Sequence, residues 1–106
     1  MIVRTAVLEG TVSPEDQQAF DAFMHETVVP AIATYPGILR VSLRKTTQAD
    51  DGAPPIYMIH DLYFKDVAAM DAALASDVRT QVRELIKQGM SKFEGRVYHL
   101  VQDVVE

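Results

Sequence analysis

The chain has 106 residues, enough for one domain with a single hydrophobic core and too few for a second domain beside it. Its formal net charge of −5 and its scattered basic residues argue against nucleic-acid binding, because such proteins cluster Lys and Arg against phosphates. The absence of cysteine excludes disulfides and thiolate catalysis, and no apolar stretch approaches the ~20 residues that span a bilayer. We therefore expect a cytoplasmic protein with no membrane partner.

The first half of the chain predicts a strand followed by a helix. Ile2–Leu8 is rich in β-branched residues and is followed by a glycine at position 10, which is typical of a strand and its end. Pro14 suits the first position of a helix, and the acidic residues after it favour the helix dipole. Pro30 lacks a backbone N–H, so we expect a kink or an early helix end near Val28.

Two strands, Ile38–Lys45 and Ile56–Phe64, are predicted to form a hairpin through the exposed loop Thr46–Pro55. The first strand alternates, with Leu39 placed on its core side. The register of the hairpin is left open, because turn geometry sets it.

The remaining third of the chain predicts a second helical segment and a closing strand. Asp66 is placed to cap a helix, and Ser76 or Asp77 marks a break or a fresh cap before the apolar pattern resumes. Residues 93–95 are read as a turn, and Arg96–Val105 as the last strand.

The predicted order of elements is strand, helix, strand, strand, helix, strand. This order specifies an α+β sandwich of the ferredoxin-like βαββαβ type over residues 1–106, with one sheet face left uncovered. Because a bare sheet face needs a partner, a homodimer is expected.

Three stretches resemble the dimeric α+β barrel superfamily and, within it, the group similar to EthD, the ethyl tert-butyl ether degradation protein. They are Phe20–Val41, with its Val-Pro-Ala and Tyr-Pro-Gly-Ile sequences, Tyr57–Asp66, which reads YMIHDLYFKD, and the Ala-rich segment ending near Ser76. The resemblance implies a four-stranded antiparallel sheet, helices on one face, and a dimer formed by the open faces, enclosing a small cavity in each half.

Members of this superfamily include cofactor-free monooxygenases, lactone isomerases, polyketide cyclases and haem-degrading enzymes. EthD-like proteins often carry a histidine two positions before the helix proline, where this chain has Val28; His25 lies three residues upstream. The chain has neither tryptophan nor asparagine, so the Asn, Trp and His set of the quinone-forming monooxygenases has no full counterpart.

The histidines are the candidate acid–base groups, because only their side chains titrate near neutral pH when unperturbed. His60 and His99, on predicted strands, are the candidate catalytic residues, and His25 is a candidate substrate-binding residue. A base in a cavity would take a proton from a phenol or an activated carbon. The alternative is a partly buried structural histidine.

A set of polar side chains on the predicted hairpin forms the candidate substrate-binding face. In the barrel this face would look toward the cavity and the partner subunit, where arginine would orient a carboxylate or enolate and tyrosine would donate a hydrogen bond. The alternative is a solvent-facing edge and an interface ion pair. The candidates are Arg40, Arg44, Tyr57, Asp61 and Tyr63, with Ser42 beside them.

No spacing in the chain is typical of a zinc site, a nucleotide-binding loop or a hydrolase elbow, so we expect no metal and no cofactor. The leading hypothesis is a small homodimeric barrel that binds a hydrophobic or aromatic metabolite, as a catabolic or biosynthetic enzyme of monooxygenase, isomerase or cyclase type. The alternative is a noncatalytic binding or accessory protein whose open sheet face is only a dimer interface.

Overall fold

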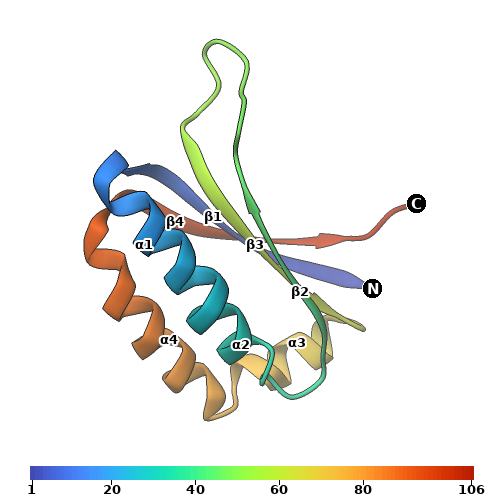
Figure 1. Cartoon of the computed structure of the whole chain (residues 1–106). Coiled ribbons are helices and arrows are strands. Elements are labelled where there is room, and N and C mark those ends of the chain that lie inside the picture. The colour runs from blue at the N-terminus through green and yellow to red at the C-terminus, as the bar shows by residue number, and fades with distance from the viewer.

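The computed structural model describes residues 1–106 as a four-stranded antiparallel sheet in the order β2-β3-β1-β4, with helices on one face (Figure 1). This arrangement confirms the predicted ferredoxin-like α+β fold. The strands are β1 (Ile2–Val12), β2 (Ile38–Lys45), β3 (Ile56–Phe64) and β4 (Phe93–Asp103). The helices are α1 (Pro14–Phe23), a π-helical turn (Met24–Val28), α2 (Val29–Ile32), α3 (Val67–Leu74), α4 (Val78–Gly89) and a 3₁₀ turn (Met90–Lys92).

The hydrophobic core lies between the helices and the face of the sheet that they cover. Its most completely buried large side chains are Phe64 of β3 and Met24 and Val28 of the π-helical turn. The α1–α2 helix and α4 lie side by side across the sheet, and the β2–β3 hairpin extends beyond the helices (Figure 1). The other sheet face, here called the open face, carries no helix.

Pro30 changes the helix without ending it at Val28. The helix passes through a π-helical turn over Met24–Val28 and continues as α2 to Ile32. Proline has no N–H to donate to the carbonyl group one helical turn earlier, and its ring would clash with that carbonyl group in a regular α-helix. A wider turn just before the proline makes room for both groups. The predicted disturbance is therefore a change of helical hydrogen bonding.

The break and the cap predicted for the second helical segment are confirmed. The Asp66 carboxylate accepts a hydrogen bond of 2.8 Å from the backbone N–H of Ala69 at the start of α3. The chain leaves the helix after Leu74 and re-enters one at Val78. No helix of the fold has the length and hydrophobicity that crossing a bilayer requires.

The strands β1 and β4 are longer than the sequence analysis expected. Gly10, read as the end of the first strand, pairs with Gly95 of β4, and residues 93–95 belong to β4 rather than to a turn. A Cβ atom on Gly10 would overlap the carbonyl oxygen of Glu94, and one on Gly95 would overlap that of Glu9. The two glycines therefore allow close strand approach where a side chain would block it.

A bulge in β2 changes which residue enters the core. Ile38 pairs with Phe64 and Arg40 pairs with Tyr63, so Leu39 is the extra residue between them. Leu39 is consequently 59% exposed, contrary to the expected core position, while Ile38 packs against the core.

We expect Gly10→Ala to lower the free energy of unfolding by roughly 2 kcal/mol or more, because the added methyl group meets backbone that has no room to move. Gly52→Ala is the control: its new Cβ would meet nothing, so only its backbone conformation, with φ at +85°, would cost about 1 kcal/mol. Urea unfolding of the two variants measures the difference. Equal losses would contradict the close-approach explanation.

Candidate functional site

A cavity of about 680 Å³ lies between the helix-covered face of the sheet and α4. This volume falls within the range of small-molecule sites, roughly 300–1,000 Å³. Its floor comes from β1, β3 and β4, and its walls from α4, the π-helical turn and the segment that follows α2. The residues that line it include Arg4, Leu8, Met24, Tyr35, His60, Arg79, Val82, Arg83, Ile86, Lys87 and His99.

The floor of the cavity places two histidines on either side of an alanine. Ala6 of the central strand β1 pairs with His60 of β3 and with His99 of β4, so all three side chains point to the same face. The small Ala6 side chain leaves room between the two imidazoles. The two predicted catalytic residues therefore line one cavity.

His60 is buried, with 4% of its surface exposed, and its Nε2 atom has no hydrogen-bond partner in the protein. Burial lowers the pKa of His60 to about 4; the charge of Asp61 opposes this shift and that of His99 adds to it. At neutral pH only about one molecule in a thousand would carry the proton. His60 is thus a neutral imidazole whose Nε2 remains unsatisfied, an uncommon state for a buried polar atom.

His99 lies closer to solvent, on the edge strand β4. Its pKa is also lowered, first by partial burial and then by the positive charges of Arg4 and Arg79. His60 shows the larger of the two shifts. Of the two, His99 is consequently the stronger base near neutral pH.

Four of the five polar candidates of the hairpin lie on the open face of the sheet, outside the cavity: Arg40, Arg44, Asp61 and Tyr63. The Asp61 carboxylate, buried although it faces no helix, accepts hydrogen bonds from Thr5 at 2.9 Å and Ser42 at 3.4 Å and pairs with Arg44 at 2.9 Å. Arg40 stacks on the ring of Tyr63, 4.9 Å from its centroid.

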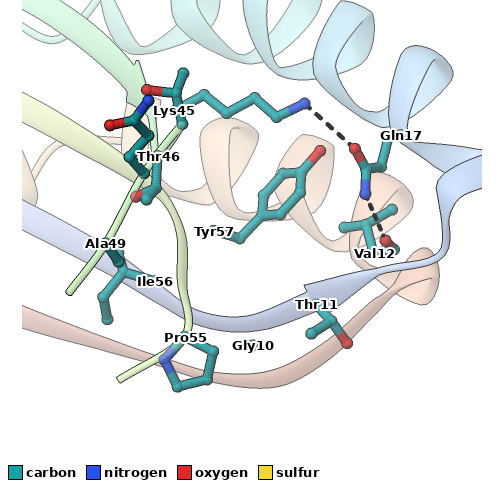
Figure 2. Close-up of a pocket in the computed structure, with 12 residues that line it drawn as sticks. Gly10, Thr11, Val12, Gln17, Lys45, Thr46, Ala49, Pro55, Ile56 and Tyr57 are labelled. Atoms are coloured by element: carbon teal, nitrogen blue, oxygen red, sulfur yellow. Dashed lines mark hydrogen bonds between the residues drawn. The ribbon is translucent and has the colours of Figure 1, made fainter. Parts of the chain in front are cut away.

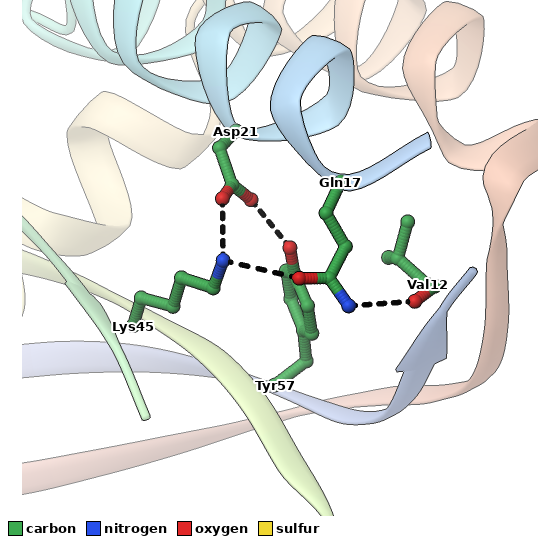
Figure 3. A network of polar contacts seen from close by, with 5 residues as sticks. All are labelled: Val12, Gln17, Asp21, Lys45 and Tyr57. Carbon is green, nitrogen blue, oxygen red and sulfur yellow. Dashed lines mark hydrogen bonds and ion pairs between the residues drawn. The ribbon is translucent and has the colours of Figure 1, made fainter. Parts of the chain in front are cut away.

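Tyr57 lies on the helix side and does not share the face of Asp61. The pairing of β1 with β3 is irregular at one point, where Leu8 pairs with Met58 and Glu9 pairs with Ile56. Tyr57 is the extra residue between them, and this bulge turns its side chain toward α1. There its hydroxyl donates a hydrogen bond to Asp21, which also accepts one from Lys45 at 2.7 Å, with Gln17 completing the network (Figure 3).

A second, smaller pocket of about 320 Å³ opens beside this network at the base of the β2–β3 hairpin (Figure 2). Its titratable groups, Lys45 and Tyr57, are both engaged by Asp21. The pocket therefore offers no free acid or base, and the larger cavity is the candidate site.

His25 is exposed on the π-helical turn, whereas Val28 is fully buried. The wider π-helical turn sets the two residues on different sides of the helix. His25 is not part of the cavity lining. No group of three or more His, Asp or Glu side chains is arranged to hold a metal ion.

The sequence analysis missed the cations and the tyrosine of the cavity wall. Arg4 was visible as a charge at a core-facing position of an otherwise apolar strand, which is a signal in itself. Arg79 and Arg83 of α4 line the cavity. Tyr35 entered the prediction only as part of the Tyr-Pro-Gly-Ile sequence.

The sequence matches no protein-family model and no curated protein. Solved structures with the same fold include an EthD family protein from Bacillus halodurans, at 20% identity and a TM-score of 0.78, covering 99% of this chain and 100% of the other. An antibiotic biosynthesis monooxygenase is 19% identical, with a TM-score of 0.62 and full coverage of both chains. SnoaB from Streptomyces nogalater, a cofactor-independent oxygenase, is 13% identical, with a TM-score of 0.65, covering 99% of this chain and 93% of the other.

These likenesses extend over nearly the whole chain and confirm the fold expected from the resemblance to EthD and the dimeric α+β barrel proteins. At such identities they are evidence for the fold alone. The chemistry has to be argued from the cavity.

We expect the free energy of unfolding to fall as the pH drops from 6.5 toward 4, because His60 binds a proton in the unfolded chain but stays neutral in the folded one over this range. The full loss of unfolding free energy that His60 would cause is of order 3 kcal/mol. His60→Gln should flatten the fall, and His25→Gln, which changes an exposed histidine, should not. Urea midpoints at about pH 7 and about pH 4.5 measure it; the same slope in all three proteins would contradict the assignment.

Proposed function

We propose that the protein is a cytoplasmic homodimer that binds a hydrophobic or aromatic metabolite in the cavity over Ala6 and moves a proton on it, as a cofactor-free enzyme of monooxygenase, isomerase or cyclase type. The observation that carries the proposal is the unpartnered Nε2 of buried His60 in a cavity of ligand size. A bound molecule that reached this buried atom would supply its missing hydrogen-bond partner. SnoaB, which shares this fold, is a cofactor-independent oxygenase, and the extension of such chemistry to this chain is part of the proposal.

The two histidines would have different roles. His99, the stronger base, takes the proton from a phenol or an activated carbon of the ligand. His60, held neutral by burial, forms a hydrogen bond through Nε2 that fixes the position of the ligand. His99 also lies nearer the solvent, to which the proton must eventually pass.

A noncatalytic binding protein is the second candidate. It is favoured by the low pKa of His60, since a neutral buried imidazole also suits a structural group. In that case the cavity would hold a ligand without changing it.

Proton abstraction can be tested with 5-nitrobenzisoxazole, an aromatic carbon acid whose ring opens to a coloured phenolate when a base removes its proton. We expect the protein to accelerate this reaction and His99→Gln to lower the rate by roughly 100-fold, the usual contribution of a general base. The measurement is the absorbance of the phenolate over time.

His25→Gln is the matched control for this assay, because it removes a histidine outside the cavity, and it should react like the unmodified protein. His60→Gln should weaken binding of the probe more than it slows the chemical step. Equal rates in all the variants, with the probe still bound, would contradict the enzyme proposal and favour the noncatalytic one.

The homodimer is proposed to form through the open face. Leu100 of β4, which pairs with Thr5, is a large apolar side chain that remains 44% exposed there. A second copy packed on this face would bury it. It would also cover the Arg44–Asp61 pair.

We expect Leu100→Lys to dissociate the homodimer, because Leu100 pairs with Thr5 on the open face and the substitution puts a charge into the interface. Val101→Lys is the control: Val101 is the next residue of the same strand, 49% exposed, and points to the helix side. Sedimentation velocity measures the assembly. A monomeric unmodified protein, or dissociation by both variants, would contradict this interface.

A further inference from the structure

The cavity wall is strongly basic, although the chain as a whole is acidic, with a net charge of −5. Four cationic side chains line the cavity: Arg4, Arg79, Arg83 and Lys87. Glu84 is the single carboxylate among the lining residues. The cavity lining therefore carries a net positive charge in a chain whose net charge is negative.

None of these four cations has a carboxylate within 4.0 Å. Ion pairs are formed instead by basic residues outside the cavity: Arg44, Lys45, Lys92 and Arg96. With 15 acidic residues for 10 basic ones, carboxylates are not scarce in this chain. The four cations of the cavity thus have no ion-pair partner, whereas four of the basic residues outside the cavity have one.

Arg4 is the most informative of the four, because it comes from the central strand and not from the surface. It is half-buried on the cavity floor, and burial together with the charge of Arg79 lowers its pKa. A guanidinium in such surroundings is costly unless something compensates its charge. No side chain of the protein does so.

The cations of α4 follow one another at intervals of four residues, so they lie along one side of the helix. Like charges at this spacing destabilise a helix slightly, by tenths of a kcal/mol per pair. Beneath them, on the adjoining stripe, Val82 and Ile86 contribute apolar surface to the same cavity. The wall thus offers a basic edge above an apolar interior.

Tyr35 adds a hydrogen-bond donor to this basic edge. It is 6% exposed, and burial raises the pKa of its hydroxyl while Arg79, Arg4 and Arg83 act in the opposite direction. The tyrosine and the three arginines line the same cavity. A hydroxyl and guanidinium groups together suit a carboxylate, which accepts several hydrogen bonds at once.

We infer that the ligand of the cavity is an organic anion, a hydrophobic or aromatic carboxylate whose negative group is held by Arg4, Arg79 and the Tyr35 hydroxyl while its apolar body lies against Leu8, Met24 and Ile86. This inference rests on the proposed function, in that it takes the cavity to be a metabolite site. It adds the charge of the ligand and the residues that select it.

The test compares 2-naphthoate with 2-naphthamide, two probes of nearly the same shape that differ in charge. We expect 2-naphthoate to bind about tenfold more tightly or better, as expected for hydrogen bonds to a charged group. Arg79→Gln should remove most of this preference and leave the affinity for 2-naphthamide unchanged. Raising the salt concentration should weaken the binding of 2-naphthoate and leave the binding of 2-naphthamide unchanged. Isothermal titration calorimetry measures both affinities.

Lys65→Gln is the matched control, because it removes an exposed cation that does not line the cavity. Arg4→Gln provides a second cavity variant, and circular dichroism confirms that each variant is folded. Equal affinities for the two probes, or a loss in Arg79→Gln that affects both alike, would overturn the inference while leaving the proposed function intact. Failure of both probes to bind would overturn the inference and count against the metabolite site itself.

Discussion

The two-residue alternation of β1 is the constraint on which the site depends. β1 pairs with both β3 and β4, so its register decides which side chains of three strands share a face. Because Ala6 faces the helices, its partners His60 and His99 face them too. A shift of either pairing by one residue would turn that histidine to the open face. The small side chain of Ala6 then leaves the space that larger residues fill elsewhere in the core.

Much of the fold could be predicted from local sequence signals. Pro14 and the Asp66 cap marked helix starts correctly, and the order of elements was enough to specify the sheet. The errors occurred where two distant segments determine the structure. Nothing near Gly10 shows that Gly95 lies opposite it and lets both strands continue, and the bulge at Leu39 follows from pairing with β3. Local patterns predict elements well, but pairing sets their ends and faces.

The candidate site was only partly predictable for the same reason. His60 and His99 were chosen by their chemistry, and the structure brings them to one cavity. The arginine and tyrosine anchors were sought on the face opposite the helices, since the resemblance suggested a cavity toward the partner subunit. The larger cavity lies on the helix side, where Arg4 is a charged residue on the core-facing side of β1. That charge was visible in the sequence; the approach of Arg79 from α4 was not, because it depends on how the helix packs.

The basic edge and the histidines also affect each other. Burial and the charges of Arg4 and Arg79 lower the pKa of His99, so without a bound anion this base is weaker than an ordinary histidine. An anion held between the two arginines would offset their charge and raise the pKa of His99 again. The base would therefore strengthen when a ligand of the right charge is bound and weaken when it leaves. Charge selection and proton transfer would then depend on the same pair of arginines, without any movement of the fold.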